Sequence, residues 1–289
     1  SQQMKSNETA SDYWDEEIIP EKRLLTLNLR EVFKYWDLVT LFVRRDFVAN
    51  YKQTILGPAW FIIQPLFSTI TFTVIFGKVA NITTNGVPPL LFYLGGLTMW
   101  NYFSTNLLGC SNTFTTNQGI FGKVYFPRLV VPISTVISNL VKLSVQFILF
   151  LVVWLYYWLY TGEVEPNIYI LFLPLYVGIG AISSLGMGII ISSLTTKYRD
   201  FNFLLGFGVQ LLMYASPIIY PFSVVPEQYR WILLLNPMSS VIESFKYSFT
   251  GSGMFLGTGL IYSSIFCVIV LFVGIIIFNR TERSFMDTV

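Results

Sequence analysis

Six long apolar stretches, separated by short polar turns, occupy most of the chain after residue 58, and only one of them contains a charged residue, Lys142. A helix of about 20 apolar residues crosses the hydrocarbon core of a bilayer. The pattern therefore predicts an all-α polytopic membrane protein, in which residues 59–289 form a six-span domain. The predicted spans are Ala59–Gly77, Pro89–Cys110, Ile133–Tyr160, Ile168–Leu194, Phe201–Tyr220 and Leu256–Phe278.

A different pattern precedes the first span, over residues 25–58. Apolar residues, among them Trp36 and Phe47, recur there mostly at spacings of three and four, with basic residues between them. The basic residues near its end are Arg44, Arg45 and Lys52. This predicts an amphipathic interfacial helix in the headgroup plane, which Gly57-Pro58 would end. The alternative is a helix packed on a soluble core. Residues 1–24 are predicted to be a cytoplasmic tail.

The segment 216–253, just before the last span, is too apolar for a loop and is interrupted by prolines. It predicts two short re-entrant helices, because irregular backbone at membrane depth must be buried in protein. Each helix would contain two opposite charges three residues apart. The two pairs are Glu227 with Arg230, and Glu243 with Lys246.

The basic residues predict the orientation of the spans. Fourteen of the 18 Lys and Arg residues lie before span one, in the turns after spans two and four, or after span six. Cytoplasmic loops are enriched in Lys and Arg, so we expect both termini in the cytoplasm and the segment 216–253 on the outer face.

Composition excludes several classes of function. Charged residues make up only 12% of the chain, and its net charge of +2 does not indicate nucleic-acid binding. The spans contain no acidic residue and the chain contains no histidine, which argues against an ion-driven carrier and an intramembrane enzyme. The two cysteines lie in apolar stretches and indicate packing, and no motif for a metal or a nucleotide phosphate is present.

Several motifs occur in a fixed order: RRDFVANYKQTILGPAWFIIQP, GKVYFPRLVVPIS, KYRDF, NPMSSVIESFKYSFTG and NRTERSF. With these motifs the chain, from about residue 25 to its end, resembles the membrane subunit of bacterial ABC exporters of polysaccharides. The O-antigen, teichoic acid and capsule exporters are of this type. The resemblance implies a six-span subunit of the bacterial inner membrane that forms a homodimeric pore.

The resemblance also implies a separate ABC ATPase subunit, which would bind ATP and Mg²⁺, so no cofactor is expected in this chain. Two short charged loops would be the ATPase-coupling segments. The first would be 123–128, with Lys123, Tyr125 and Arg128. The second would consist of Lys197, Tyr198, Arg199 and Asp200. From the residues alone, both loops are suitable for docking a partner and are also topology anchors.

The substrate implied by the resemblance is a lipid-linked polysaccharide. Sugars stack on aromatic rings, and aromatic residues that we place near the span ends are candidates for lining a channel, although an aromatic belt against lipid is the alternative. These residues are Trp100, Tyr102, Phe103, Tyr214 and Tyr220. Lys142 would either snorkel and pair with polar groups or contact an anionic headgroup. A related ABC permease for a drug, a lipid or another small molecule is the competing hypothesis.

Overall fold

The computed structural model describes residues 29–52 and 54–286. The predicted tail 1–24 and the first residues of the predicted interfacial helix lie outside this part. The described residues form helices and turns and no strand, which confirms the all-α class. The α-helices are α1 (Leu29–Lys34), α2 (Trp36–Tyr51), α3 (Trp60–Phe72), α4 (Pro89–Ser111), α5 (Thr113–Thr116), α6 (Gln118–Phe121), α7 (Val130–Tyr156), α8 (Leu173–Thr195), α9 (Phe201–Tyr214), α10 (Glu227–Leu235), α11 (Pro237–Thr250) and α12 (Gly257–Met286).

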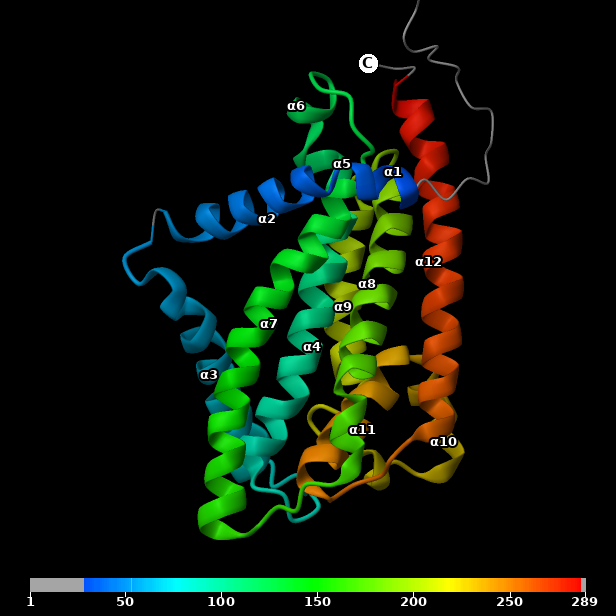
Figure 1. The fold of residues 1–289 in the computed structure, drawn as a ribbon. Coiled ribbons are helices and arrows are strands. Elements are labelled where there is room, and N and C mark those ends of the chain that lie inside the picture. Colours follow the sequence, from blue (N-terminus) through cyan, green and yellow to red (C-terminus); the bar gives the residue numbers. More distant parts are fainter. Residues whose placement is uncertain (1–28, 53, 287–289) are drawn as a thin grey trace, which may run out of the picture.

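Four helical stretches of the described chain are long and apolar enough to cross a membrane, so this is a multi-pass membrane protein. The stretches are Gly57–Val79, Val130–Thr161, Ile168–Thr195 and Gly257–Glu282, and they include short 3₁₀ or π turns next to the α-helices. α4 has 23 residues and also runs along the bundle (Figure 1). It is less apolar than the four, and most of its residues are buried against neighbouring helices.

The predicted fifth span, Phe201–Tyr220, is helical only in its first part. α9 ends at Tyr214, and Ser216–Tyr220 are not helical. Pro217 has no backbone amide and disfavours helix in the residue before it, which explains the early end. A 14-residue helix is about 21 Å long, shorter than the hydrocarbon core.

α12 contains the predicted last span, Leu256–Phe278, except for its first residue, and continues beyond it through the basic stretch to Met286. α12 packs against α8 at a place where both helices have a glycine. A Cβ on Gly186 would lie 2.7 Å from the Leu271 nitrogen, and one on Gly274 would lie 2.8 Å from the Gly186 oxygen. On the other side of α8, a Cβ on Gly188 would lie 2.5 Å from the Cys110 Cβ. Small residues thus make α8 an interior helix between α4 and α12.

α1 and α2 lie across the end of the bundle (Figure 1), and α2 packs against α7. The predicted single helix is interrupted at Tyr35 and ends at Tyr51. Its apolar residues point in two directions, which the periodicity did not predict. Those buried against the protein are Val32, Val39 and Phe42, whereas Phe33, Trp36 and Phe47 are exposed.

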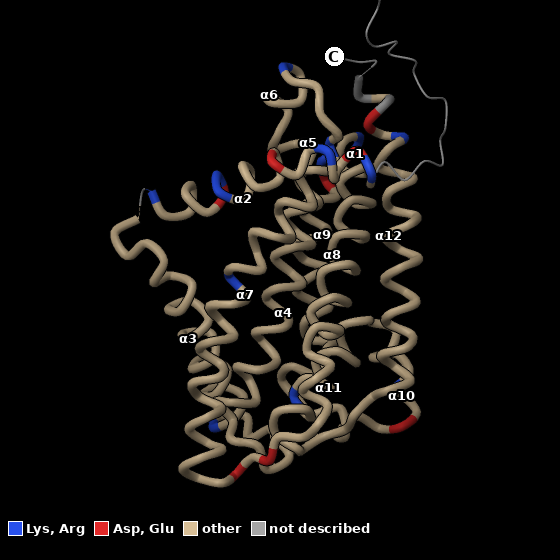
Figure 2. Tube along the Cα trace, in the orientation of Figure 1, with Lys and Arg blue, Asp and Glu red and all other residues tan. Residues whose placement is uncertain are grey.

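Charged residues gather at the two ends of the bundle (Figure 2). The end formed by α1, α5, α6 and the last turns of α12 is called the basic end below. At the opposite end lie α10 and α11. α11 begins with Asn236, whose side chain accepts a hydrogen bond from the Met238 amide, and ends at Gly251 with a positive φ of 70°. These are a favoured N-cap residue and a favoured C-terminal residue, and they explain why a helix forms here.

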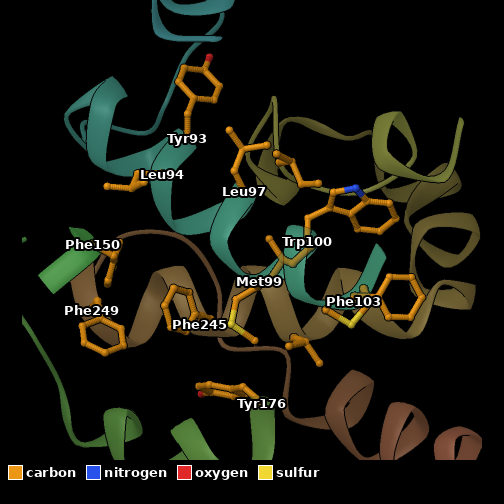
Figure 3. Packing of buried hydrophobic residues seen from close by; sticks show 14 of the residues in the cluster. Tyr93, Leu94, Leu97, Met99, Trp100, Phe103, Phe150, Tyr176, Phe245 and Phe249 are labelled. Atoms are coloured by element: carbon orange, nitrogen blue, oxygen red, sulfur yellow. The ribbon is translucent and has the colours of Figure 1, made fainter. Parts of the chain in front are cut away.

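Three clusters of buried apolar side chains hold the described helices together. The largest joins α4, α7, α8 and α11 and contains many aromatic rings (Figure 3), among them Trp100, Phe150 and Phe245. The second lies at the basic end and joins α1 and α2 to the segment 126–131 and to α12. The third is small and lies between α4 and α7, with Tyr102, Cys110, Val136 and Leu143. Burial of these rings is the main contribution to the stability of the bundle.

Candidate functional site

Two turns at the basic end expose side chains that a partner protein can contact. In the first turn, between α6 and α7, Val124 and Tyr125 are 60% and 79% exposed, and Lys123 is exposed as well. In the second turn, between α8 and α9, Lys197, Tyr198, Arg199 and Asp200 are all exposed. A hydrogen bond joins two helices that end near these turns. The Thr195 hydroxyl at the end of α8 donates to the Ser111 carbonyl at the end of α4, at 3.2 Å.

Arg128 does not belong to this exposed surface, contrary to the prediction that it faces a partner. It is only 3% exposed, because the chain folds back into the bundle at Phe126. Its backbone amide donates to Glu282 Oε1 on α12 at 3.3 Å, and its Nε lies 3.9 Å from the same oxygen. Burial lowers the pKa of the Arg128 guanidinium, and the Glu282 carboxylate opposes this shift. An arginine nonetheless stays protonated in proteins, so a buried guanidinium faces a carboxylate whose side chain is 26% exposed.

A chain of aromatic contacts fixes the base of the first turn. The Arg128 guanidinium lies 4.9 Å from the Phe121 ring centroid, and the Phe121 ring lies 5.7 Å from Phe126. Phe126 in turn contacts Phe42 of α2 at 5.7 Å. The exposed tip of the turn is therefore held by a base that is packed against α2.

The polar residues of α2 lie mostly on its exposed side. Arg44 and Lys52 are exposed, and Arg45 pairs with Asp46 at 2.9 Å while its guanidinium covers the Phe42 ring at 4.6 Å. With Trp36 and Phe47 also exposed, the helix presents both basic and aromatic groups, which is the composition of a helix at a membrane surface.

Three of the channel candidates lie inside the folded chain. Trp100, Tyr102 and Phe103 are 3%, 4% and 0% exposed. They are in the middle of α4 and not near a span end, and Figure 3 shows Trp100 and Phe103 among the other core side chains. The prediction failed because α4 is enclosed by other helices, so its aromatic rings pack against protein.

The remaining channel candidates are more accessible. Tyr214 at the end of α9 is exposed, and Tyr220 is half-buried and donates its hydroxyl hydrogen to the Tyr214 carbonyl at 3.0 Å. Lys142 is half-buried on α7, with its Nζ 5.6 Å from the Phe61 ring centroid.

Both predicted charge pairs of the segment 216–253 form, but in different surroundings. Glu227 and Arg230 of α10 lie 3.6 Å apart at the surface. Glu243 and Lys246 of α11 are also 3.6 Å apart, with side chains only 3% and 6% exposed. Lys246 Nζ donates to the Pro217 carbonyl at 2.5 Å, and a Glu243 oxygen accepts from the Phe222 amide at 3.4 Å. The buried pair thus holds the segment 217–222 against α11.

Comparison with known proteins defines the family. Residues 37–250 match the model of the ABC-2 type transporter family. This chain belongs to the ABC-2 type transporter family. The match covers α2 to α11, so it includes both exposed turns and the buried charge pair.

Several curated ABC-2 transporters resemble this one over most of their length. An O-antigen export system permease protein of Klebsiella pneumoniae is 27% identical over 254 residues, which are 87% of this chain and 95% of the relative. One of Myxococcus xanthus is 25% identical over 263 residues, or 90% of this chain and 98% of the relative. A polysialic acid transport protein of Escherichia coli is 27% identical over 249 residues, or 84% and 93%.

One residue of this ABC-2 transporter that contacts a candidate site residue was not singled out from its sequence. Glu282 lies after the predicted last span, in the motif NRTERSF, and no role was assigned to it there. The signal that could have found it is spacing. Phe278 and Glu282 are four residues apart, which places both on one face of a helix that continues beyond the span. In the structure Phe278 stacks on Phe114 at 4.7 Å, next to the Arg128 site.

Proposed function

We propose that this chain is the membrane subunit of an ATP-driven exporter that moves a lipid-linked polysaccharide across the bacterial inner membrane. The observation that carries the proposal is the similarity to export permeases for O-antigen and polysialic acid, which extends over 84% to 90% of this chain. A family match to one domain alone would not distinguish a glycan exporter from an exporter of another substrate.

In this proposal six helices cross the membrane. α4 is the second crossing helix, and its polar residues are tolerated because it is surrounded by protein. α9 is the fifth, with the segment 215–220 completing the crossing. The positive-inside rule supports a cytoplasmic basic end, with both termini in the cytoplasm, and it places α10 and α11 as re-entrant helices on the outer side.

Two copies of the chain form the pore. The interior of one copy is filled by core side chains such as Trp100 and Phe103, so a polysaccharide needs a passage between copies. α9 offers an apolar surface for this contact, because Phe203 and Phe207 are 83% and 63% exposed. Lipid is the other candidate for covering this surface.

A separate ATPase subunit, which holds ATP and Mg²⁺, docks on the two exposed turns of the basic end. The second turn is suited to transmit force because only residues 196–200 connect α8 to α9. A short connection between two packed helices moves both of them together, so displacement of the turn by the ATPase reaches the bundle.

Reversing the charges of this turn tests the assignment. We expect Arg199→Glu together with Asp200→Arg to leave insertion and folding unchanged, because both side chains are exposed. Docking should weaken by about 2 to 5 kcal/mol if the charges become buried in the interface. Co-purification of the ATPase, ATP turnover and surface glycan export measure the effect.

The matched control changes Glu163 and Glu165 to Lys. Both are exposed and lie at the opposite end of the bundle, before α8. This control should export normally. Normal export and docking in the Arg199 and Asp200 variant, or a larger defect in the control, would show that the turn is only a topology anchor.

A further inference from the structure

Glu282 and Arg128 connect two elements that are far apart in sequence. Arg128 stands at the base of the first exposed turn, and Glu282 lies in the last turns of α12. Two contacts join them, one from the Arg128 backbone amide at 3.3 Å and one from its Nε at 3.9 Å, both to the same carboxylate oxygen. A bond to the backbone fixes the position of the chain itself, so the carboxylate holds the base of the turn and not only its side chain.

The packing around the pair makes this connection stiff. Phe121 lies against the guanidinium, and Phe114 of α5 stacks on Phe278, one helical turn before Glu282. The Phe114, Phe121 and Phe278 rings all belong to the buried cluster of the basic end. The base of the turn and the end of α12 are therefore parts of one packed unit.

α12 continues from this unit to the opposite end of the bundle (Figure 1). It is an uninterrupted helix of 30 residues, about 45 Å long. Near its start, the Ser263 hydroxyl donates to the Pro237 carbonyl at 2.8 Å, and the Tyr262 hydroxyl donates to the Leu235 carbonyl at 3.2 Å. Leu235 and Pro237 flank the joint between α10 and α11, so α12 contacts both the base of the turn and this joint.

We propose that Glu282 is a positioning residue that attaches the first turn to α12, so that displacement of the turn by the ATPase moves α12 and the joint between α10 and α11. This inference rests on the proposed function, because it takes the turn as an ATPase contact. Arg128 and Glu282 thereby take part in coupling, although an exposed docking surface for the ATPase would not include them. Arg128 acts through Glu282, and neither needs to touch the partner.

Charge exchange in the full transporter with its ATPase tests the proposal. The variants are Glu282→Gln, which keeps an oxygen that can accept the Arg128 amide, Glu282→Arg, and the exchange Arg128→Glu with Glu282→Arg. Arg280→Glu is the matched control, because Arg280 is exposed on the same helix two residues away. The readouts are co-purification of the ATPase and glycan exported per ATP hydrolysed in proteoliposomes.

We expect Glu282→Arg to retain ATPase binding and hydrolysis but to lower export per ATP about fivefold, within the range of single-residue coupling effects. The exchange variant should recover only part of the loss, because it restores opposite charges but arginine cannot accept the hydrogen bond from the amide of residue 128. Glu282→Gln should fall between Glu282→Arg and the wild type, and Arg280→Glu should match the wild type. If Glu282→Arg does not fold, the exchange variant is compared with Arg128→Glu alone. A higher export of glycan per ATP in the exchange variant then supports the inference. Wild-type coupling in Glu282→Gln and Glu282→Arg, or no recovery in the exchange variant, would overturn the inference.

The proposed function fails in a different way. A wild-type chain that binds no ATPase or exports no glycan would contradict the proposed function. A wild-type chain that does both, together with unimpaired Glu282 variants, would contradict only the role of Glu282.

Discussion

α10 and α11 are neighbouring short helices with the same local arrangement of charge but with opposite surroundings. Each has a glutamate three residues before a basic residue, and each pair closes to 3.6 Å. The Glu227 side chain is 91% exposed, whereas that of Glu243 is 3% exposed. The spacing decides that a pair forms, but burial decides its energetic importance, because water screens the first pair and not the second.

The surroundings of the two pairs explain their different roles. Arg230 bonds to carbonyls of the preceding loop, with its Nε 2.9 Å from the Val225 oxygen. Lys246 reaches the Pro217 carbonyl and lies 3.7 Å from the Phe92 ring centroid, so it connects three segments. We therefore expect α11 to depend on its pair and α10 to tolerate the loss of its pair.

The largest effect should come from breaking the buried pair on one side. Lys246→Met leaves the Glu243 carboxylate buried without its cation, which typically costs about 3 to 5 kcal/mol. Thermal unfolding of the purified chain in detergent measures this loss. The double variant Lys246→Met with Glu243→Gln should recover most of it, because no buried charge then remains. A single variant as stable as the wild type would show that water reaches the site.

A smaller effect should follow from crowding the buried carboxylate. Gly253 has a φ of 104°, and a Cβ there would lie 2.8 Å from Glu243 Oε1. Gly253→Ala should cost about 1 to 3 kcal/mol through backbone strain. Gly206→Ala on α9 is the control. A Cβ there meets no atom within 4 Å, so stability should stay equal or rise in the same unfolding assay. Equal stability of Gly253→Ala and the wild type would mean that the loop relaxes.

The smallest effect is expected on α10. Glu227→Gln removes the charge of an exposed side chain, and such pairs contribute at most about 1 kcal/mol. The unfolding midpoint should move little, and the remaining difference from the wild type should shrink in high salt. A loss as large as that of Lys246→Met would contradict the distinction between the two helices.

The sequence predicted the helices better than it predicted which residues the folded chain buries. The charge pairs and the helical class followed from spacing and composition, which are local properties. The predicted fifth span extends past the end of α9, because the apolar run continues beyond Pro217. The sequence did not predict that α12 continues beyond the last span, because the residues there are polar and are held by packing against α5 and the segment near Arg128.

The predicted site residues fall into an exposed group and a buried group. Lys123, Tyr125 and the residues 197–200 are exposed, as a docking surface requires, but whether a partner binds there stays a prediction. Trp100, Tyr102 and Phe103 were chosen by residue type and Arg128 by the resemblance to polysaccharide exporters, and all four are buried. Residue type does not distinguish an aromatic ring that faces a channel from one that faces another helix.

The sequence by itself determined that this chain is helical, that it crosses a membrane several times and where charge pairs can close, because these depend on the order of apolar and charged residues along a few turns. Only the tertiary structure decided that α4 is enclosed, that Glu243 and Lys246 are withdrawn from water, and that Arg128 meets Glu282. Burial depends on which helices pack together, and residues 154 positions apart in the chain meet only when the whole bundle has formed.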